Sequence, residues 1–234
     1  MSAIDDAFHG LRHIIASGEL APGQRFPPEA DLCERLGVSR GSLREAVRML
    51  DALGVIESRH GSGTYVSALE PANIIGALSL TVELMPFDAF IELYEVRRVL
   101  ESHAASQAAA RMTDAGAAEL RDILDELEAR EGEQGTELDA RFHETIARLA
   151  GNAALVELLR TFRSRSRAYQ VFDLPSGSDM KQVSDRGHRE ILAALVNRDP
   201  ASAETAAAAH VAQTEQWLRT HRPAPVAQAL PTAS

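Results

Sequence analysis

The sequence predicts a mainly α-helical protein in two parts, with one short β-hairpin between them. Apolar residues recur every three or four positions over most of the 234 residues, which is the period of a helix. A hairpin pattern, two short runs of β-forming residues around glycines, occurs near residue 60. With 45% hydrophobic and 25% charged residues, the chain is globular and long enough for two domains with cores of their own.

Three helices are expected before the hairpin. The first spans Ile4–Ser17, and Gly18 ends it. The second, Glu29–Leu36, begins after two prolines, which suit the start of a helix. The third lies within Leu36–Leu53, where Ser39 is placed to cap the first exposed N–H groups. The short turn between the second and third helices is typical of a helix-turn-helix.

The third helix has two distinct faces. Its apolar positions recur with the helical period and predict a buried face, formed by Leu43, Val47 and Leu50. A second stripe is cationic and consists of Arg40, Arg44 and Arg48. A helix with one face in a core and arginines near its N-terminus suits the major groove of DNA. For an arginine stripe taken alone, a solvated surface helix is the alternative.

A hairpin follows the third helix, which Gly54 ends. Val55–Ser58 and Thr64–Val66 are the expected strands, and Arg59–Gly63 is the turn. Three helices followed by a hairpin make a winged helix-turn-helix, the unit predicted for residues 1–68. The turn combines a cation, an imidazole and glycines, so it can reach a phosphate or enter the minor groove of DNA. An inert turn is the alternative.

Charge and cysteine content narrow the class of protein. The net charge of −10 argues against non-specific nucleic-acid binding by the whole molecule. Between Arg35 and His60, however, five arginines outnumber three acids, which favours a site-specific DNA-binding protein. The one cysteine, Cys33, excludes an internal disulfide framework. The sequence has no run of membrane-spanning length and no signal-peptide pattern, so a cytoplasmic location is expected.

Residues 10–66 contain an ordered set of short motifs. They are Pro22-Gly23, Pro27-x-Glu29, Gly37-Val38-Ser39-Arg40, Leu43-Arg44-Glu45-Ala46, Gly54-Val55-Ile56 and Gly61-Ser62-Gly63-Thr64-Tyr65-Val66. This set resembles the N-terminal signature of the GntR family of bacterial transcription regulators. The resemblance implies double-stranded DNA as a partner, contacted by Ser39, Arg40, Ser42, Arg44, His60 and Gly61. Two usual contacts are missing, because Ala30 stands where the family commonly has arginine, and Gly41 where a side chain often contributes.

The rest of the chain is helical in pattern and predicts an antiparallel bundle over residues 69–222. The expected helices are Asn73–Met85, Asp88–Met112, Asp114–Arg130, Glu137–Ala150, Ala153–Phe172, Ser184–Arg198 and Pro200–Thr220. The expected N-caps are Thr113, Thr136 and Asp199. Ser67–Pro71 is the expected linker, and residues 223–234, rich in alanine and proline, are expected to form a disordered tail.

Four polar residues lie on faces of these helices that should be apolar. Asp139 and His143 are one turn apart on one helix, and His188 and His210 lie on the inner stripes of the last two helices. One such histidine is more often a hydrogen-bonded core residue than a ligand. Burying all four unpaired would cost several kcal/mol, whereas a divalent metal ion would satisfy them together. Zinc is the expected ion, and nickel and manganese also suit three imidazoles and a carboxylate.

The order of these residues is also informative. Asp-x-x-x-His is followed by a second histidine about 45 residues later and a third about 22 further on. With Asp139-x-x-Phe142-His143, Asp185-x-x-His188 and Leu93-x-x-x-Arg97-x-x-x-Glu101, this pattern resembles the FCD effector-binding domain of the FadR subgroup of the same family. The resemblance implies that the four side chains hold a metal and that an organic acid binds beside it.

Arg97 is the candidate for binding that effector. It shares an apolar stripe with Leu93 and Leu100, so its guanidinium should point into the bundle, where it can pair with a carboxylate. An internal ion pair with Glu101 is an equal alternative. Two weaker candidates lie further along the chain, Arg163 and Arg167.

The leading functional hypothesis is a homodimeric, ligand-responsive transcription regulator, a repressor, on a palindromic operator. Effector binding in the helical domain would shift the spacing of the two wings, through a difference in affinity of ~1–3 kcal/mol between two states of the dimer. One alternative is a metal-dependent enzyme acting on a small carboxylate, since a histidine-rich site can activate water. Another is a metal that is structural or is itself the signal.

Overall fold

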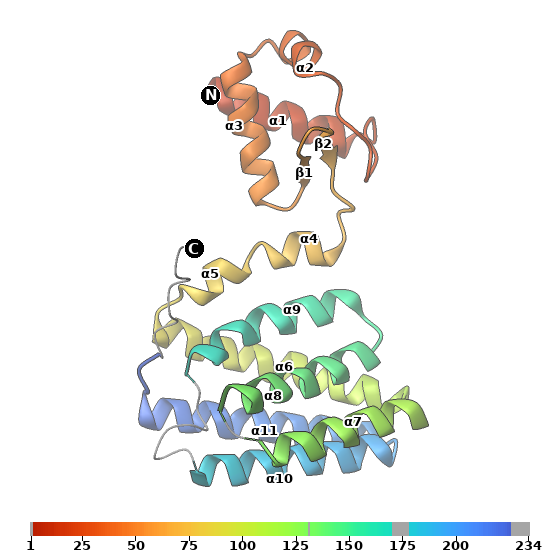
Figure 1. Cartoon of the computed structure of the whole chain (residues 1–234), viewed down its shortest axis with the longest axis vertical. Helices are drawn as coiled ribbons and strands as arrows, with labels where there is room; N and C mark the ends of the chain where they lie inside the picture. The colour runs from red at the N-terminus through yellow and green to blue at the C-terminus, as the bar shows by residue number, and fades with distance from the viewer. Residues whose placement is uncertain (1, 131, 170–177, 226–234) are drawn as a thin grey trace. The chain divides into compact units, whose positions relative to one another are not determined.

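The computed structural model describes residues 2–130, 132–169 and 178–225, and the chain divides into two compact units, residues 1–78 and 79–234. Both units are mainly helical, as the sequence predicts (Figure 1). The first unit includes the helix after the hairpin, whereas the predicted domain boundary precedes that helix. Of the predicted C-terminal tail, residues 226–234 lie outside the described residues.

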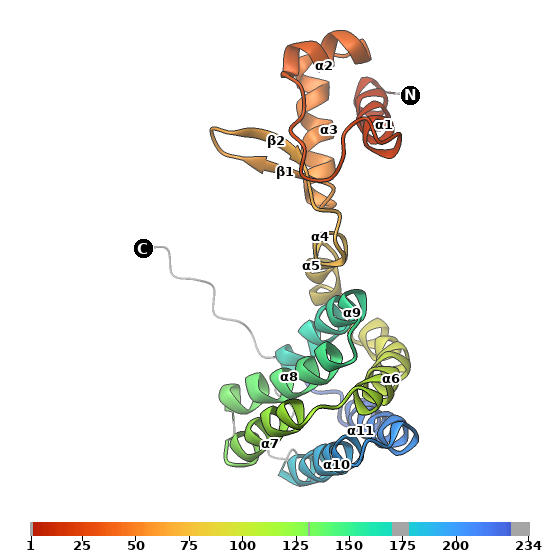
Figure 2. The same ribbon diagram turned by 90° about the vertical axis from the view of Figure 1, so that its right-hand side faces the viewer.

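The N-terminal unit is a winged helix-turn-helix. Its elements are α1 (Ala3–Ala16), α2 (Glu29–Leu36), α3 (Arg40–Ala52), β1 (Ile56–Arg59), β2 (Gly63–Val66) and α4 (Pro71–Gly76). The three helices and the hairpin confirm the prediction, and Figure 2 shows the hairpin extending beside α3. Leu11, Leu43 and Leu50 fill the core between α1 and α3, so the apolar stripe of the arginine helix faces inward as expected. The oxygen of Ser39 accepts the N–H of Ser42 at 3.1 Å and caps α3.

The hairpin pairs Ile56 with Val66 and Arg59 with Gly63 in an antiparallel register. A third extended segment lies along β2, and the sequence did not reveal it. The N–H of Phe26 donates to the carbonyl of Thr64, and the N–H of Val66 donates to the carbonyl of Gln24, both at 2.8 Å. The segment before α2 therefore anchors the wing to the helical core.

Gly54 is where α4 meets the base of the wing. Its φ of +71° suits glycine, and a Cβ at this position would lie 1.8 Å from the carbonyl oxygen of Asn73 in α4. Ser67 is buried, and its hydroxyl donates to the carbonyl of Gly54 at 2.7 Å.

The prediction of one helix over Asn73–Met85 is wrong. The chain forms two short helices, α4 held on the wing and α5 (Ser79–Glu83).

Among its described residues, the helical unit contains α5 and six longer helices. The longer helices are α6 (Phe87–Ala110), α7 (Asp114–Glu128), α8 (Gly132–Leu149), α9 (Ala153–Ser164), α10 (Ser178–Val196) and α11 (Pro200–His221), with a 3-10 turn, η1 (Arg165–Tyr169), after α9. Thr113 and Asp199 are N-caps as predicted, but Thr136 lies inside α8, which begins earlier than expected. The predicted helix Ala153–Phe172 ends at Ser164, and α10 begins before the predicted Ser184.

Small residues bring the helices of this unit close together. α6 contacts α8, α9, α10 and α11, and Figures 1 and 2 show it beside α11. Ala105 and Ala108 of α6 and Ala203 of α11 are fully buried, which allows the two backbones to approach. Larger side chains such as Phe142 and Leu195 fill the space toward α7 and α10.

None of the described helices is long and apolar enough to cross a membrane.

Candidate functional site

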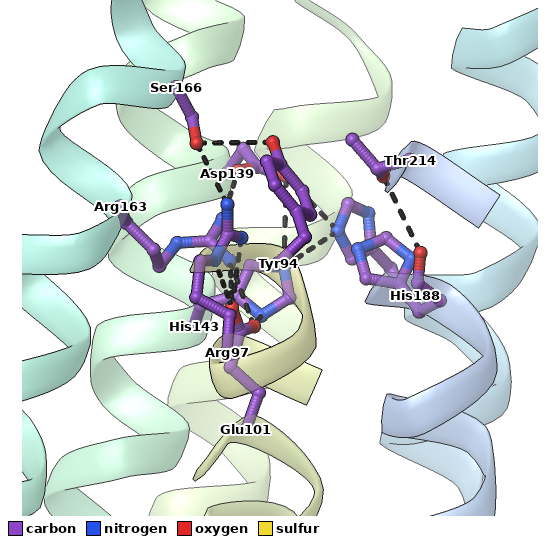
Figure 3. A network of polar contacts seen from close by, with 10 residues as sticks. Tyr94, Arg97, Glu101, Asp139, His143, Arg163, Ser166, His188 and Thr214 are labelled. Carbon is purple, nitrogen blue, oxygen red and sulfur yellow. Dashed lines mark hydrogen bonds and ion pairs between the residues drawn. The ribbon is translucent and has the colours of Figure 1, made fainter. Parts of the chain in front are cut away.

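The helical unit brings together the four polar residues singled out in the sequence. Asp139 and His143 lie one turn apart on α8, His188 lies on α10 and His210 on α11. Each offers one ligand atom, and these four atoms all lie within 4.8 Å of one another. The histidines are buried and Asp139 is nearly so. Figure 3 shows Asp139 and His143 facing His188 across the bundle.

Short distances within the cluster define its centre. His188 Nε2 lies 3.2 Å from Asp139 Oδ1 and 3.3 Å from His143 Nε2. The ring of His210 stacks on that of His143, with centroids 5.1 Å apart and an interplanar angle of 27°. Gly187 makes room for His210, because a Cβ at this position would lie 2.6 Å from His210 Nδ1. Glycine at position 187, next to His188, therefore leaves room for the ring of His210.

Two further charged residues surround the cluster, Glu101 of α6 and Arg163 of α9. Arg163 Nη2 donates to Asp139 Oδ2 at 2.5 Å, and Arg163 Nη1 lies 2.9 Å from Glu101 Oε2. The same carboxylate oxygen lies 3.1 Å from His143 Nδ1. Glu101 and Arg163 therefore orient both the carboxylate and the imidazole that α8 contributes (Figure 3).

Arg97 forms the buried ion pair with Glu101 that the sequence left as one of two alternatives. Arg97 Nε donates to Glu101 Oε1 at 2.9 Å, and Nη1 donates to Ser166 Oγ at 2.8 Å. Its guanidinium also lies over the ring of Tyr94, 4.3 Å from the centroid. Arg97 thus points into the bundle, and its binding of an effector stays a prediction.

Burial and neighbouring charges fix the ionisation of the cluster. Desolvation, aided by the charge of Arg163, lowers the pKa of His143 to about 4, and desolvation holds the pKa of His210 well below its ordinary value. Burial alone would raise the pKa of Asp139 and Glu101, but Arg163 and the groups around it hold both well below their usual range. His143 and His210 are therefore neutral and both carboxylates are ionised, the forms that bind metals.

The residues present fit a divalent metal ion. Three imidazoles and one carboxylate converge on one point, a donor set that suits zinc, nickel or manganese. His188 turns Nε2 toward the cluster, so this nitrogen would bind the metal and Nδ1 would remain free to donate a hydrogen bond. Within the part of the chain that the structure describes, His188 Nδ1 and His210 Nδ1 are buried without a hydrogen-bond partner.

Sequence reasoning missed part of this network. Arg163 ranked as a weak candidate because arginines surround it on several faces, and the side chain of Arg167 lies outside the described residues. Glu101 entered only as a partner for Arg97. Its position one turn after Arg97, on the buried face of α6, was the available signal. Nothing in the sequence pointed to Ser166.

The predicted DNA-contacting residues lie on α3 and on the wing turn. Arg40, His60 and Gly61 are exposed, and Gly61 has a φ of +70°. Arg44 is exposed but paired, since its Nε and Nη2 each lie 3.1 Å from a carboxylate oxygen of Glu29. Ser39 and Ser42 share the N-cap of α3, with their hydroxyls 3.0 Å apart.

Replacing Glu101 with glutamine should strongly destabilise the helical unit, because the buried guanidinium of Arg97 would lose its counter-charge and Arg163 would keep only Asp139. Breaking a buried ion pair in this way costs ~3–5 kcal/mol. Urea unfolding followed by the fluorescence of Trp217, the only tryptophan and a residue of α11, measures the change.

Glu119→Gln is the matched control. Glu119 pairs with Arg148 at 2.6 Å, but both side chains are about half exposed, so the loss should stay below ~1 kcal/mol. Equal losses of unfolding free energy in the two variants would contradict the buried network.

Comparison with known proteins identifies both units. The model of the FCD domain matches residues 92–213, and that of the bacterial regulatory proteins, gntR family, matches residues 3–66. The HTH-type transcriptional regulator LutR of Bacillus subtilis (strain 168) is 33% identical over 211 residues, which cover 88% of this chain and 96% of LutR. The Uxu operon transcriptional regulator of Escherichia coli (strain K12) is 32% identical over 220 residues, which cover 89% of this chain and 83% of that regulator.

A solved structure supports the same assignment. The Streptococcus agalactiae GntR structure superposes with a TM-score of 0.61 at 29% identity, over 92% of this chain and 99% of that one. These relatives are regulators, and the metal-dependent enzyme considered from the sequence has no support among them. The chain therefore belongs to the GntR family of bacterial regulatory proteins, with a DNA-binding module followed by an FCD domain, and it is a transcription regulator rather than an enzyme.

Proposed function

We propose that this regulator is a homodimeric repressor of the FadR subgroup that acts on DNA in the cytoplasm. It binds a palindromic operator and responds to a small organic acid at a metal site formed by Asp139, His143, His188 and His210. The observation that carries the proposal is the convergence of these four ligand atoms within 4.8 Å, in the unit that follows a winged helix-turn-helix. When bound, the metal supplies an open coordination position for an anionic oxygen.

The charge balance of the site favours an anionic effector. The carboxylates of Asp139 and Glu101 balance the guanidiniums of Arg97 and Arg163. A divalent cation would therefore leave two positive charges uncompensated in a largely buried site. Since an unpaired buried charge is costly, a ligand with one or two carboxylates is the favoured occupant.

Two guanidiniums are placed to hold such a ligand. Arg163 already contacts Asp139, so it lies beside the proposed metal, and Arg97 lies on the other side of Glu101. Either can exchange a contact with protein oxygens for a bidentate contact with an effector carboxylate. We propose Arg97 as the effector-binding residue, and Arg163 joins it on the strength of its contact with Asp139.

A small cavity formed by described residues adjoins the site. This cavity of about 20 Å³ lies between α8 and α9, lined by residues that include His143 and Arg163. That volume suits about one water molecule. We propose that effector binding moves α9 relative to α8, and that this motion provides the difference in affinity between two states that allostery needs.

Movement of α9 has a route toward the DNA-binding unit. In η1, which continues α9, Ser166 binds Arg97 of the site, and the adjacent Arg165 donates from Nη1 to the carbonyl of Glu83. Glu83 is the last residue of α5, which also contacts α9. Only two residues separate α5 from α4. A shift at the effector site can thus be transmitted to the segment that leads into the DNA-binding unit.

Dimerisation is proposed through the helical unit. This unit exposes Leu80 and Leu84 at α5 and Val96 and Val99 on α6, of which Leu84 is 73% exposed and Val99 is 65% exposed. Paired apolar side chains at helical spacing indicate a protein contact surface. Two copies would place two recognition helices on successive turns of a palindrome.

Metal and effector binding should both depend on Asp139. Protein purified without chelator should carry about one metal ion per chain by elemental analysis, and Asp139→Asn and His188→Ala should lose it because each removes a ligand. Calorimetry against a panel of hydroxy, keto and dicarboxylic acids should detect binding in the metal-loaded wild type and none in Asp139→Asn or His188→Ala.

Asp185→Asn is the matched control, since Asp185 has the same 17% exposure as Asp139 but pairs with Lys181. It should retain both metal and acid. Absence of metal from the wild type would contradict the site. A metal that alone changes DNA affinity, with no acid binding, would contradict the effector role and favour a metal sensor.

Operator recognition should depend on α3. Selection from random DNA duplexes with the wild-type protein should yield an inverted repeat with half-sites about one helical turn apart, or a multiple of it. On the selected duplex, Arg40→Ala and Arg44→Ala should each weaken binding by ~1–3 kcal/mol if these side chains reach base edges.

Arg35→Ala is the control, because Arg35 is an exposed arginine of the same unit, also paired with a glutamate, and lies on α2. Gel-shift titration measures all three variants. Unchanged affinity in Arg40→Ala would contradict the assigned recognition helix, and selection of a single half-site would contradict the dimer.

A further inference from the structure

Most arginines of the DNA-binding unit are paired with glutamates. The pairs are Arg35–Glu19, Arg44–Glu29, Arg48–Glu45 and Arg59–Glu57. Among the described residues, no acidic group lies within ion-pair distance of the remaining three arginines, Arg12, Arg25 and Arg40. Of these, Arg40 lies on the recognition helix. The other two raise the question of whether their charges have a partner on DNA.

Arg25 lies at the base of the wing. Its backbone pairs with Tyr65 of β2, and the next residue, Phe26, is buried in the core. Successive side chains of an extended segment alternate between faces, so Arg25 points away from the core. The Arg25 guanidinium crosses Gly63, where an added Cβ would lie 2.8 Å from Arg25 Nε. Glycine at this position allows the guanidinium to lie directly on the wing backbone.

A groove of about 720 Å³ lies beside Arg25, between the helix-turn-helix and the wing. Arg44, Arg48 and Val47 of α3 line one wall, and Ser58, Gly63 and Thr64 of the hairpin line the other. Three arginines and one acid, Glu29, are among its lining residues, so the groove is cationic. A DNA strand that passes from the recognition helix to the wing has to cross this groove.

We infer that Arg25 contacts a backbone phosphate of the DNA strand that crosses this groove. The inference rests on the proposed operator binding and adds a residue outside the set that the GntR resemblance assigns. A phosphate is favoured over a base edge, because Arg25 lies between the two base-reading elements rather than on either of them.

The test compares Arg25→Gln with Arg12→Gln, an exposed and unpaired arginine of α1 that does not line the groove. The probe is the duplex selected with the wild-type protein, and Kd is measured between about 50 and 300 mM salt. Arg25→Gln should lower the slope of log Kd against log salt by about 1 and weaken binding to all sequences alike, and Arg12→Gln should change neither. Arg25→Lys keeps the charge and should keep the slope.

Neutral methylphosphonate linkages, placed one at a time along each strand, locate the contact. One linkage should weaken wild-type binding and have no further effect on Arg25→Gln. An unchanged salt slope in Arg25→Gln would overturn the inference, as would a changed base preference, which indicates direct base contact. Failure of the wild type to select any duplex would instead refute operator binding, so the two failures are distinguishable.

Discussion

The interior of the helical unit depends on the carboxylate of Glu101. It accepts from Arg97 at 2.9 Å and from Arg163 at 2.9 Å, and it lies 3.1 Å from His143, so it joins α6, α8 and α9. Transferring ions from water into a protein interior costs several kcal/mol each, and only near-neutral, hydrogen-bonded sets persist there. Glu101 and Asp139 together provide that neutrality for Arg97 and Arg163. Burial and the charge of Arg163 keep His143 neutral, and Arg163 keeps Asp139 ionised, which are the forms that bind a metal.

A similar balance governs the DNA-binding unit at its surface. Exposed ion pairs such as Arg44–Glu29 contribute little to stability, so a phosphate or base can replace the glutamate at small cost. The glutamates also lower the net positive charge of the recognition face and, with the net charge of −10, disfavour indiscriminate DNA binding. Unpaired arginines such as Arg40 and Arg25 then contribute a larger share of the electrostatic attraction between this unit and DNA. Both units therefore hold arginine and carboxylate in pairs that a ligand can exchange.

The periodicity of the sequence was sufficient for the winged unit, the bundle and the inward orientation of Asp139, His143, His188 and His210. What it missed depends on contacts between distant segments. No local pattern indicates that Gly54 must accommodate the carbonyl of Asn73, or that Gly23–Phe26 pairs with β2. Helix ends failed for a related reason, because Thr136 is a good cap in isolation but α8 starts a turn earlier. The sequence could not single out Arg163 among the arginines of its segment, because its role depends on Glu101 and Asp139, which lie on other helices.

The central claim is that three histidines and an aspartate from three helices bind one metal ion. X-ray absorption at the metal edge tests it most directly, because imidazole rings give a distinctive multiple-scattering pattern. For zinc, we expect a first shell of three imidazole nitrogens with oxygen donors, all at about 2.0–2.2 Å, and no bound metal in Asp139→Asn. A first shell without imidazole scattering, or one unchanged in His188→Ala, would contradict the account.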